Sequence, residues 1–145
     1  MFRPGVSFII PFRVYMPEDF YTVKIDNKEV KIKPQALSPV VINSGSYETV
    51  MMLDTGASIT LISLELAQKT GQEDLNKVSR RTFSTAKGSM SCPIVEREVV
   101  VAGLDKKQPV AVNLEDDSNL LGVDFFESRG YIIDNSSKCI YVWSK

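Results

Sequence analysis

Histidine is absent from this sequence of 145 residues. Without it, the chain cannot form the Ser-His-Asp or Cys-His arrangements that activate a nucleophile in many hydrolases. It also lacks the commonest side-chain ligand for zinc. A catalyst built from this chain must therefore rely on carboxylates, Lys, Tyr, Cys or a borrowed cofactor.

Cysteine is scarce as well. The chain has two cysteines, Cys92 and Cys139, which lie far apart in the sequence and lack the spacing of metal ligands. Two free buried thiols and a single disulfide are both compatible with this spacing. We expect no metal site and no cofactor.

Long apolar runs and an excess of charge are missing too. No stretch approaches the roughly 18 apolar residues that cross a bilayer, and Pro11 and Arg13 interrupt the run at residues 8–10 before it reaches the length of a signal peptide. The formal net charge is −1, so nothing indicates attraction to nucleic acid or to an anionic membrane. We therefore expect a cytoplasmic protein that binds neither nucleic acid nor a membrane.

The remaining pattern is typical of a globular β domain. Hydrophobic residues make up 43% of the chain and charged residues 24%, and the length is sufficient for a buried core. Apolar and polar alternation between turn residues predicts short strands over 37–42, 47–53, 59–62, 78–85, 90–101, 110–114, 131–133 and 139–143. Helix is expected at 64–70, with Ser63 as N-cap and Gly71 as its stop, and just after Gly122. Close spacing of short strands favours a closed or partly closed β-barrel.

The first 35 residues do not share this regularity. Residues 8–15 look strand-like, residues 20–33 read as a hairpin, and four prolines punctuate the segment. We expect an N-terminal extension, 1–35, that packs on the domain formed by 36–145 or on a dimer. A separate arm for a partner is the alternative.

One acidic residue ends an apolar strand. Val50-Met51-Met52-Leu53 leads directly into Asp54, which is followed by Thr55-Gly56-Ala57-Ser58. Asp is depleted in strands and is costly to bury unpaired, and Gly56 permits a tight turn. Taken alone, the pattern also describes an ordinary turn at the end of a strand. The other segments of the chain decide between the two interpretations.

Four segments, in order and spacing, resemble the retropepsin-type aspartic proteases. Residues 50–58 resemble the catalytic strand and loop of this family, and 61–71 resemble the strand and helix that follow. Ser84-Thr85-Ala86-Lys87-Gly88 resembles the flap hairpin, with Lys at a position where Asn is common. Leu120-Leu121-Gly122-Val123-Asp124-Phe125-Phe126 resembles the hydrophobic-hydrophobic-Gly segment and the helix after it. The resemblance covers residues 37–145.

The resemblance implies an all-β, retropepsin-like closed barrel with one or two short helices, one lobe per chain, in a homodimer. Asp54 would be the catalytic residue, paired with Asp54 of a second copy. Two carboxylates about 3 Å apart share a proton, so one can activate a water while the other donates to the scissile carbonyl.

The same resemblance gives roles to the neighbouring residues. Thr55 would bond across the dimer, Gly56 would let its backbone approach the carboxylates, and Ser58 would bond an outer carboxylate oxygen. With Ala57, these residues would support the active-site loop. The flap residues, which would close over an extended peptide, are Thr85, Ala86, Lys87, Gly88 and Ser89.

Further expectations follow from the positions of single residues. Lys87 at the hairpin tip would either favour acidic substrates or lie in water. Asp124 is expected at the N-terminus of the helix after Gly122, not as a second catalytic acid, and Phe125 and Phe126 are expected in the core.

The leading functional hypothesis is a homodimeric aspartic endopeptidase acting on peptides or proteins. The alternative is a catalytically silent or weak module that keeps the fold for dimerisation or peptide binding. A third possibility is a monomer whose active site assembles only on partner binding. The intact Asp54-Thr55-Gly56-Ala57-Ser58 favours catalysis, because a binding module has no need to keep a costly buried acid pair.

Overall fold

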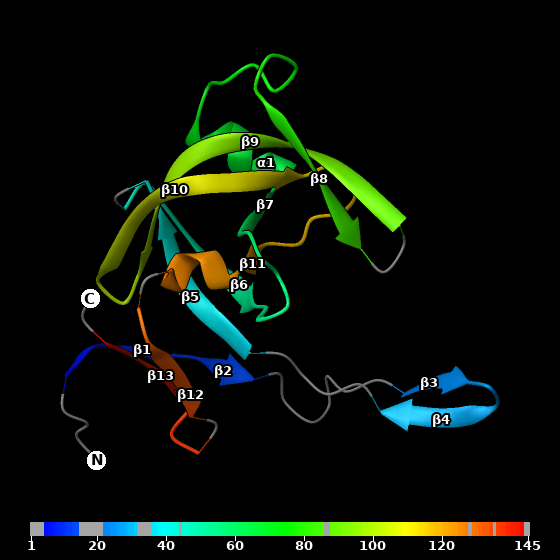
Figure 1. Ribbon diagram of the computed structural model, residues 1–145, viewed down its shortest axis with the longest axis vertical. Coiled ribbons are helices and arrows are strands. Elements are labelled where there is room, and N and C mark those ends of the chain that lie inside the picture. Colours follow the sequence, from blue (N-terminus) through cyan, green and yellow to red (C-terminus); the bar gives the residue numbers. More distant parts are fainter. Residues whose placement is uncertain are drawn as a thin grey trace.

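The computed structural model describes residues 5–14, 22–31, 36–43, 45–85, 88–127, 129–134 and 136–143. Strands dominate it, as the sequence predicts (Figure 1). The elements in chain order are β1 (Val6–Pro11), β2 (Arg13–Val14), β3 (Thr22–Ile25), β4 (Lys28–Lys31), β5 (Ala36–Ile42), β6 (Tyr47–Leu53), β7 (Leu61–Ser63), α1 (Leu64–Thr70), β8 (Arg80–Thr85), β9 (Gly88–Val101), β10 (Leu104–Asn113), β11 (Leu120–Leu121), the 3-10 helix η2 (Val123–Phe126), β12 (Tyr131–Asp134) and β13 (Cys139–Trp143).

The largest sheet closes on itself. Its strand order is β2-β5-β6-β11-β7-β10-β9-β8, and β5 also pairs with β9 through Val41 opposite Val100 and Ile42 opposite Val99. The ring therefore runs through β5, β6, β11, β7, β10 and β9, while β2 and β8 extend from it. This confirms the predicted closed barrel.

A second, three-stranded sheet joins the two ends of the chain. Its order is β1-β13-β12, with Ile10 on β1 opposite Ile140 on β13. Ile10 and Phe12 are buried in the same core as Ile140. The β3–β4 hairpin lies to one side of the main body (Figure 1). The domain boundary after residue 35 stays a prediction.

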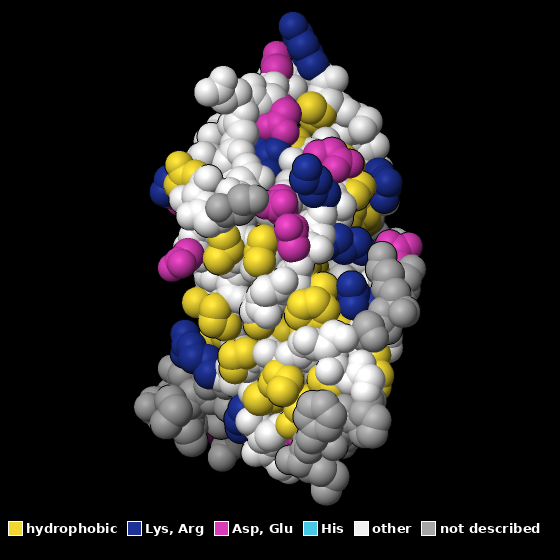
Figure 2. Space-filling model, turned by 90° about the vertical axis from the view of Figure 1, so that its left-hand side faces the viewer, with side chains coloured by type: hydrophobic (Ala, Val, Ile, Leu, Met, Phe, Trp, Pro, Cys, Tyr) yellow, Lys and Arg dark blue, Asp and Glu magenta, His cyan; other side chains and the backbone are white. Residues whose placement is uncertain are grey.

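The barrel strands enclose the main hydrophobic core. Its fully buried side chains come from most barrel strands and from η2, among them Ile42, Met51, Ile62, Val99, Val110, Leu121, Phe125 and Phe126. Phe125 and Phe126 are therefore core residues, as predicted. Figure 2 shows apolar side chains on the surface as well, over the half of the molecule that holds β1, β12 and β13. Ile9 on β1 and Ile132 on β12 are both exposed.

Helix α1 begins as predicted and ends differently. Ser63 Oγ accepts a hydrogen bond of 3.1 Å from the backbone N of Leu66, so Ser63 is the N-cap. Gly71 follows the last helical residue, but its backbone is extended, not left-handed. A Cβ at Gly71 would lie 2.2 Å from Glu73 Oε1 and 2.4 Å from a guanidinium nitrogen of Arg97. A side chain at this position would displace the side chains of Glu73 and Arg97.

A buried arginine holds the end of α1. Arg97 on β9 is 4% exposed and donates to Ala67 O at 3.0 Å and to Thr70 Oγ1 at 2.9 Å. Its guanidinium also binds both carboxylate oxygens of Glu73, at 2.5 and 2.9 Å. The Arg97 hydrogen bonds hold the pKa of Glu73 below its ordinary value, against the opposing effect of burial. The cation thus satisfies the carbonyl of Ala67, one of those that a helix end leaves open.

Both cysteines are free. Cys92 on β9 is fully buried, whereas Cys139 on β13 is partly exposed. Burial raises the pKa of the Cys92 thiol, the negative charge of Glu115 adds to the rise, and Arg80 opposes it. Among the described residues, no helix is long and apolar enough to cross a membrane.

Candidate active site

Two parallel strands present Asp54 at the edge of the barrel. Strand β6 ends at Leu53, which lies beside Leu121 of β11, and β11 also pairs with β7. The backbone N of Asp54 donates to Leu121 O at 3.0 Å. The hydrogen bonding thus continues one residue past β6 and fixes where the carboxylate leaves the sheet. Asp54 is half-buried.

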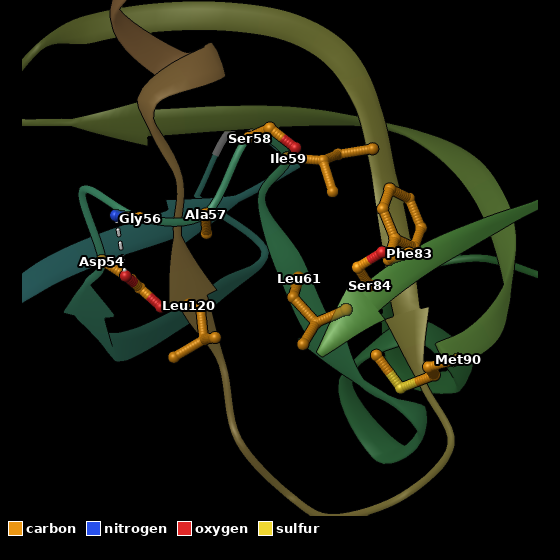
Figure 3. A pocket seen from close by; sticks show the side chains of 10 residues that line it. All are labelled: Asp54, Gly56, Ala57, Ser58, Ile59, Leu61, Phe83, Ser84, Met90 and Leu120. Atoms are coloured by element: carbon orange, nitrogen blue, oxygen red, sulfur yellow. Dashed lines mark hydrogen bonds between the residues drawn. The ribbon is translucent and has the colours of Figure 1, made fainter. Parts of the chain in front are cut away.

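The loop after Asp54 folds back on the carboxylate. The backbone N of Ala57 donates to Asp54 O at 3.1 Å, and that of Gly56 donates to Asp54 Oδ1 at 2.9 Å (Figure 3). A Cβ on Gly56 would lie 3.3 Å from the same oxygen. Glycine therefore permits close approach of the backbone to the carboxylate. Thr55 and Gly56 are exposed on the single chain.

Ala57 and Ser58 carry the loop away from the carboxylate. Ala57 O accepts a hydrogen bond of 3.0 Å from the backbone N of Val123. Ser58 is exposed and lies beside Ile59, at a distance from Asp54 (Figure 3). Within the described residues, Ser58 makes no hydrogen bond to the Asp54 carboxylate.

The far end of the loop is held by a polar cluster that the sequence did not predict. Thr60 is fully buried, and its hydroxyl donates to Asp124 Oδ1 at 2.8 Å and accepts from the backbone N of Gly122 at 3.1 Å. Asp124 Oδ2 accepts from the backbone N of Thr60 at 3.1 Å and from Gln108 Nε2 at 2.8 Å. A hydroxyl residue between the apolar Ile59 and Leu61 is the signal that could have indicated this cluster.

The placement of Asp124 differs in part from the prediction. Asp124 does lie in the first turn of η2, as predicted, but the hydrogen bonds to its carboxylate come from residues outside that helix. Its carboxylate instead joins η2 to the active-site loop and to β10 through Thr60 and Gln108. The bonds to three donor atoms satisfy the charge better than the end of a short helix would.

Gly122 packs directly against the active-site loop. A Cβ at this position would lie 2.8 Å from the backbone C and O of Ile59 and 2.9 Å from Ala57 O. Real Cβ atoms do not approach backbone atoms this closely. Glycine is therefore required at position 122, because any side chain there would clash with the backbone of the active-site loop.

A hollow of about 440 Å³ opens beside Asp54. Asp54 and Leu120 lie at one end of it, and Phe83, Ser84 and Met90 lie at the other (Figure 3). The lining residues are Asp54, Gly56, Ala57, Ser58, Ile59, Leu61, Phe83, Ser84, Met90 and Leu120. Asp54 is the acidic residue among them, and the opposite wall is apolar except for the Ser84 hydroxyl.

The β8–β9 hairpin forms the far wall of this hollow. Ser84 pairs with Ser89 and Thr85 with Gly88, whose φ of +122° favours glycine. Ala86 and Lys87 lie outside the described residues. Of the predicted flap residues, Thr85, Gly88 and Ser89 thus lie at the end of the described hairpin strands. Phe83, Ser84 and Met90 line the hollow.

Comparison with known proteins agrees with this geometry. Residues 38–128 match the family model described as gag-polyprotein putative aspartyl protease. The chain belongs to this aspartyl protease family. A search of curated proteins finds no match.

A solved structure extends the aspartyl protease match. The chain is similar to the crystal structure of a retropepsin-like aspartic protease from Rickettsia conorii, with 25% sequence identity and a TM-score of 0.55. The similarity covers 92% of this chain and 95% of that one. It confirms the predicted retropepsin-like fold and extends beyond the segment that the family model matches.

Proposed function

We propose that this aspartyl protease family member is a homodimeric endopeptidase that cleaves peptide bonds through paired Asp54 carboxylates. The observation that carries the proposal is a half-buried carboxylate, held by its own loop, at one end of a largely apolar hollow. Family membership and the fold support the same reaction class.

The single chain supplies half of the required chemistry. Amide hydrolysis needs one group to activate water and another to protonate the substrate, and one carboxylate cannot do both at once. Of the ten residues that line the hollow, Asp54 is the one with a carboxylate. A twofold axis beside the loop would bring in Asp54 of the second copy.

The exposed loop is consistent with such an axis. Thr55 and Gly56 are exposed, so contacts to them can be made by another molecule. Across the axis, the ionised Asp54 would take a proton from water, and the protonated one would donate to the scissile carbonyl oxygen. Thr55 would brace the two loops against each other.

The hollow also indicates what the substrate presents. Ile59, Leu61, Phe83, Met90 and Leu120 provide an apolar lining next to Asp54. We infer that an apolar side chain beside the cleaved bond occupies it, with the peptide extended along the β8–β9 hairpin. The flap residues Thr85 to Ser89 would close over the peptide, as the family resemblance implies.

The test is cleavage of unstructured peptides by Asp54→Asn. We expect kcat to fall at least about a thousandfold, because the variant removes the group that activates water. Asp105→Asn is the matched control, since Asp105 is exposed on β10 and does not line the hollow. Circular dichroism and sedimentation should show the same fold and the same oligomer for both variants. Undiminished cleavage by Asp54→Asn would exclude this mechanism, and no cleavage by the wild type would favour the silent binding module.

A further inference from the structure

A second hollow, of about 620 Å³, adjoins the candidate active site. Ser58 and Ile59 line both hollows, so the two meet at this stretch of the active-site loop. The other lining residues come from β8, from residues 106–109 of β10, and from η2 and the residue after it. A peptide that runs through the first hollow and past Ser58 would therefore enter the second.

Some of the charged side chains in this second hollow neutralise one another. Lys106 Nζ lies 3.5 Å from Glu127 Oε2 and also donates to Asp124 O. The Asp124 carboxylate accepts three hydrogen bonds from Thr60 and Gln108, which occupy both of its oxygens. The carboxylates of Glu127 and Asp124 therefore already have partners within this chain.

Two cations remain. Arg81 on β8 and Lys107 on β10 both line the second hollow and both are exposed. Neither forms an ion pair with another described residue. The exposed hydroxyl of Ser58 adds a hydrogen-bond donor at the boundary with the active site. Three cations, Arg81, Lys106 and Lys107, thus line the hollow against two carboxylates, those of Asp124 and Glu127, so the balance of charge is positive.

We propose that this hollow, the basic pocket, binds an acidic side chain of the substrate at a position that flanks the cleaved bond. The proposal rests on the endopeptidase function proposed above and adds a specificity to it. The guanidinium fork of Arg81 suits a carboxylate, and the Lys107 ammonium adds a point charge. An apolar residue beside the bond and an acidic residue outside it would together define the preferred sequence.

The first measurement compares peptides that differ in one residue. Glu or Gln is placed in turn at each position flanking the cleaved bond, and kcat/KM is measured for each pair. We expect one position at which the Glu peptide is favoured about fivefold, as a solvent-exposed charge pair allows. The preference should shrink in about 0.5 M salt, because exposed charges are screened. Equal kcat/KM for Glu and Gln at every position would overturn the proposal.

Variants identify the residues responsible. The double variant Arg81→Gln, Lys107→Gln should reduce the Glu-to-Gln preference to about one. Arg80→Gln is the matched control, because Arg80 is the neighbouring exposed arginine on β8 and donates to Ser91 Oγ and O, both at 3.2 Å. It should keep the full preference. An unchanged preference in the double variant would assign the effect elsewhere and overturn the basic pocket.

A binding measurement separates this proposal from the endopeptidase function. Fluorescence anisotropy with labelled peptides and the Asp54→Asn variant should show tighter binding of the Glu peptide than of the Gln peptide. If the wild type cleaves both peptides equally and Asp54→Asn binds both equally, the basic-pocket proposal is wrong and the endopeptidase proposal is retained. If neither peptide is cleaved but the Glu peptide still binds more tightly, the endopeptidase proposal is wrong and the basic-pocket proposal is retained.

Discussion

Replacing Thr60 by Val tests whether the buried polar cluster holds the active-site loop. The substitution keeps the branched shape and removes the hydroxyl, which both donates to Asp124 Oδ1 and accepts from the Gly122 backbone N. That N lies in a buried environment and would lose its partner. Leaving a buried donor unsatisfied costs about 1–3 kcal/mol, and the lost bond to a carboxylate adds about 1.5 kcal/mol. We therefore expect Thr60→Val to lower the free energy of unfolding by about 3 kcal/mol.

Urea unfolding followed by fluorescence measures this difference. Thr60→Ser is the control, because it keeps the hydroxyl and deletes one methyl group, which costs about 1 kcal/mol. A loss of about 3 kcal/mol corresponds to a fall in Tm of about 10 °C for a domain of this size. If Thr60→Val is as stable as Thr60→Ser, the hydroxyl does not hold the cluster and the reasoning is wrong.

Two further substitutions probe contacts around the loop and the helix end. Gly122→Ala should disturb the loop, since its Cβ would lie 2.8 Å from the Ile59 backbone. We expect the free energy of unfolding to fall by about 2–3 kcal/mol and peptide cleavage to be reduced. If both stability and cleavage are unchanged, the close packing is contradicted. The hydrogen bonds from Arg97 lower the pKa of Glu73 in the folded state. The ionised Glu73 therefore stabilises the fold at pH values above its pKa in the unfolded chain, and this stabilisation is lost as the pH falls through its pKa in the folded state. Urea midpoints should therefore show Glu73→Gln destabilised at pH 7 and progressively closer to the wild type below about pH 4.5, whereas an equal gap at every pH would disprove the linkage.

Local signals in the sequence predicted the elements whose structure depends on neighbouring residues. The apolar run ending at Asp54 became β6 and its loop, and Ser63 became the N-cap of α1. The hairpin expected over 78–101 became β8 and β9. In each case a strand period, a cap or a turn residue acts within a few positions of the element it specifies.

The pairing of strands that lie far apart in the sequence was harder to predict from the sequence. The sequence predicted a strand from residue 110, but β10 begins at Leu104 because Ala102 and Gly103, both at positive φ, turn β9 back on itself. Asp105 to Pro109 lack a strand pattern of their own, and their backbone is ordered by pairing with β9. The contact between β5 and β9 that closes the barrel likewise leaves no periodic trace in either strand.

The polar cluster at the far end of the active-site loop could not be predicted from the sequence either. Thr60, Gln108 and Asp124 come from segments far apart in the chain, and their hydrogen bonds form only when the barrel closes. The residues next to Asp124 in the sequence predict only that it lies at the N-terminus of a helix. Only the folded chain brings its carboxylate to the loop that carries Asp54.

Mixing wild-type chains with Asp54→Asn chains tests most directly whether two copies share one active site. Equal amounts are unfolded together, refolded, and assayed for peptide cleavage at constant total concentration. A shared site with random pairing predicts about one quarter of the all-wild-type activity, because only dimers with two intact Asp54 residues are active. An activity of about one half, in proportion to the wild-type fraction, would contradict the paired-carboxylate account.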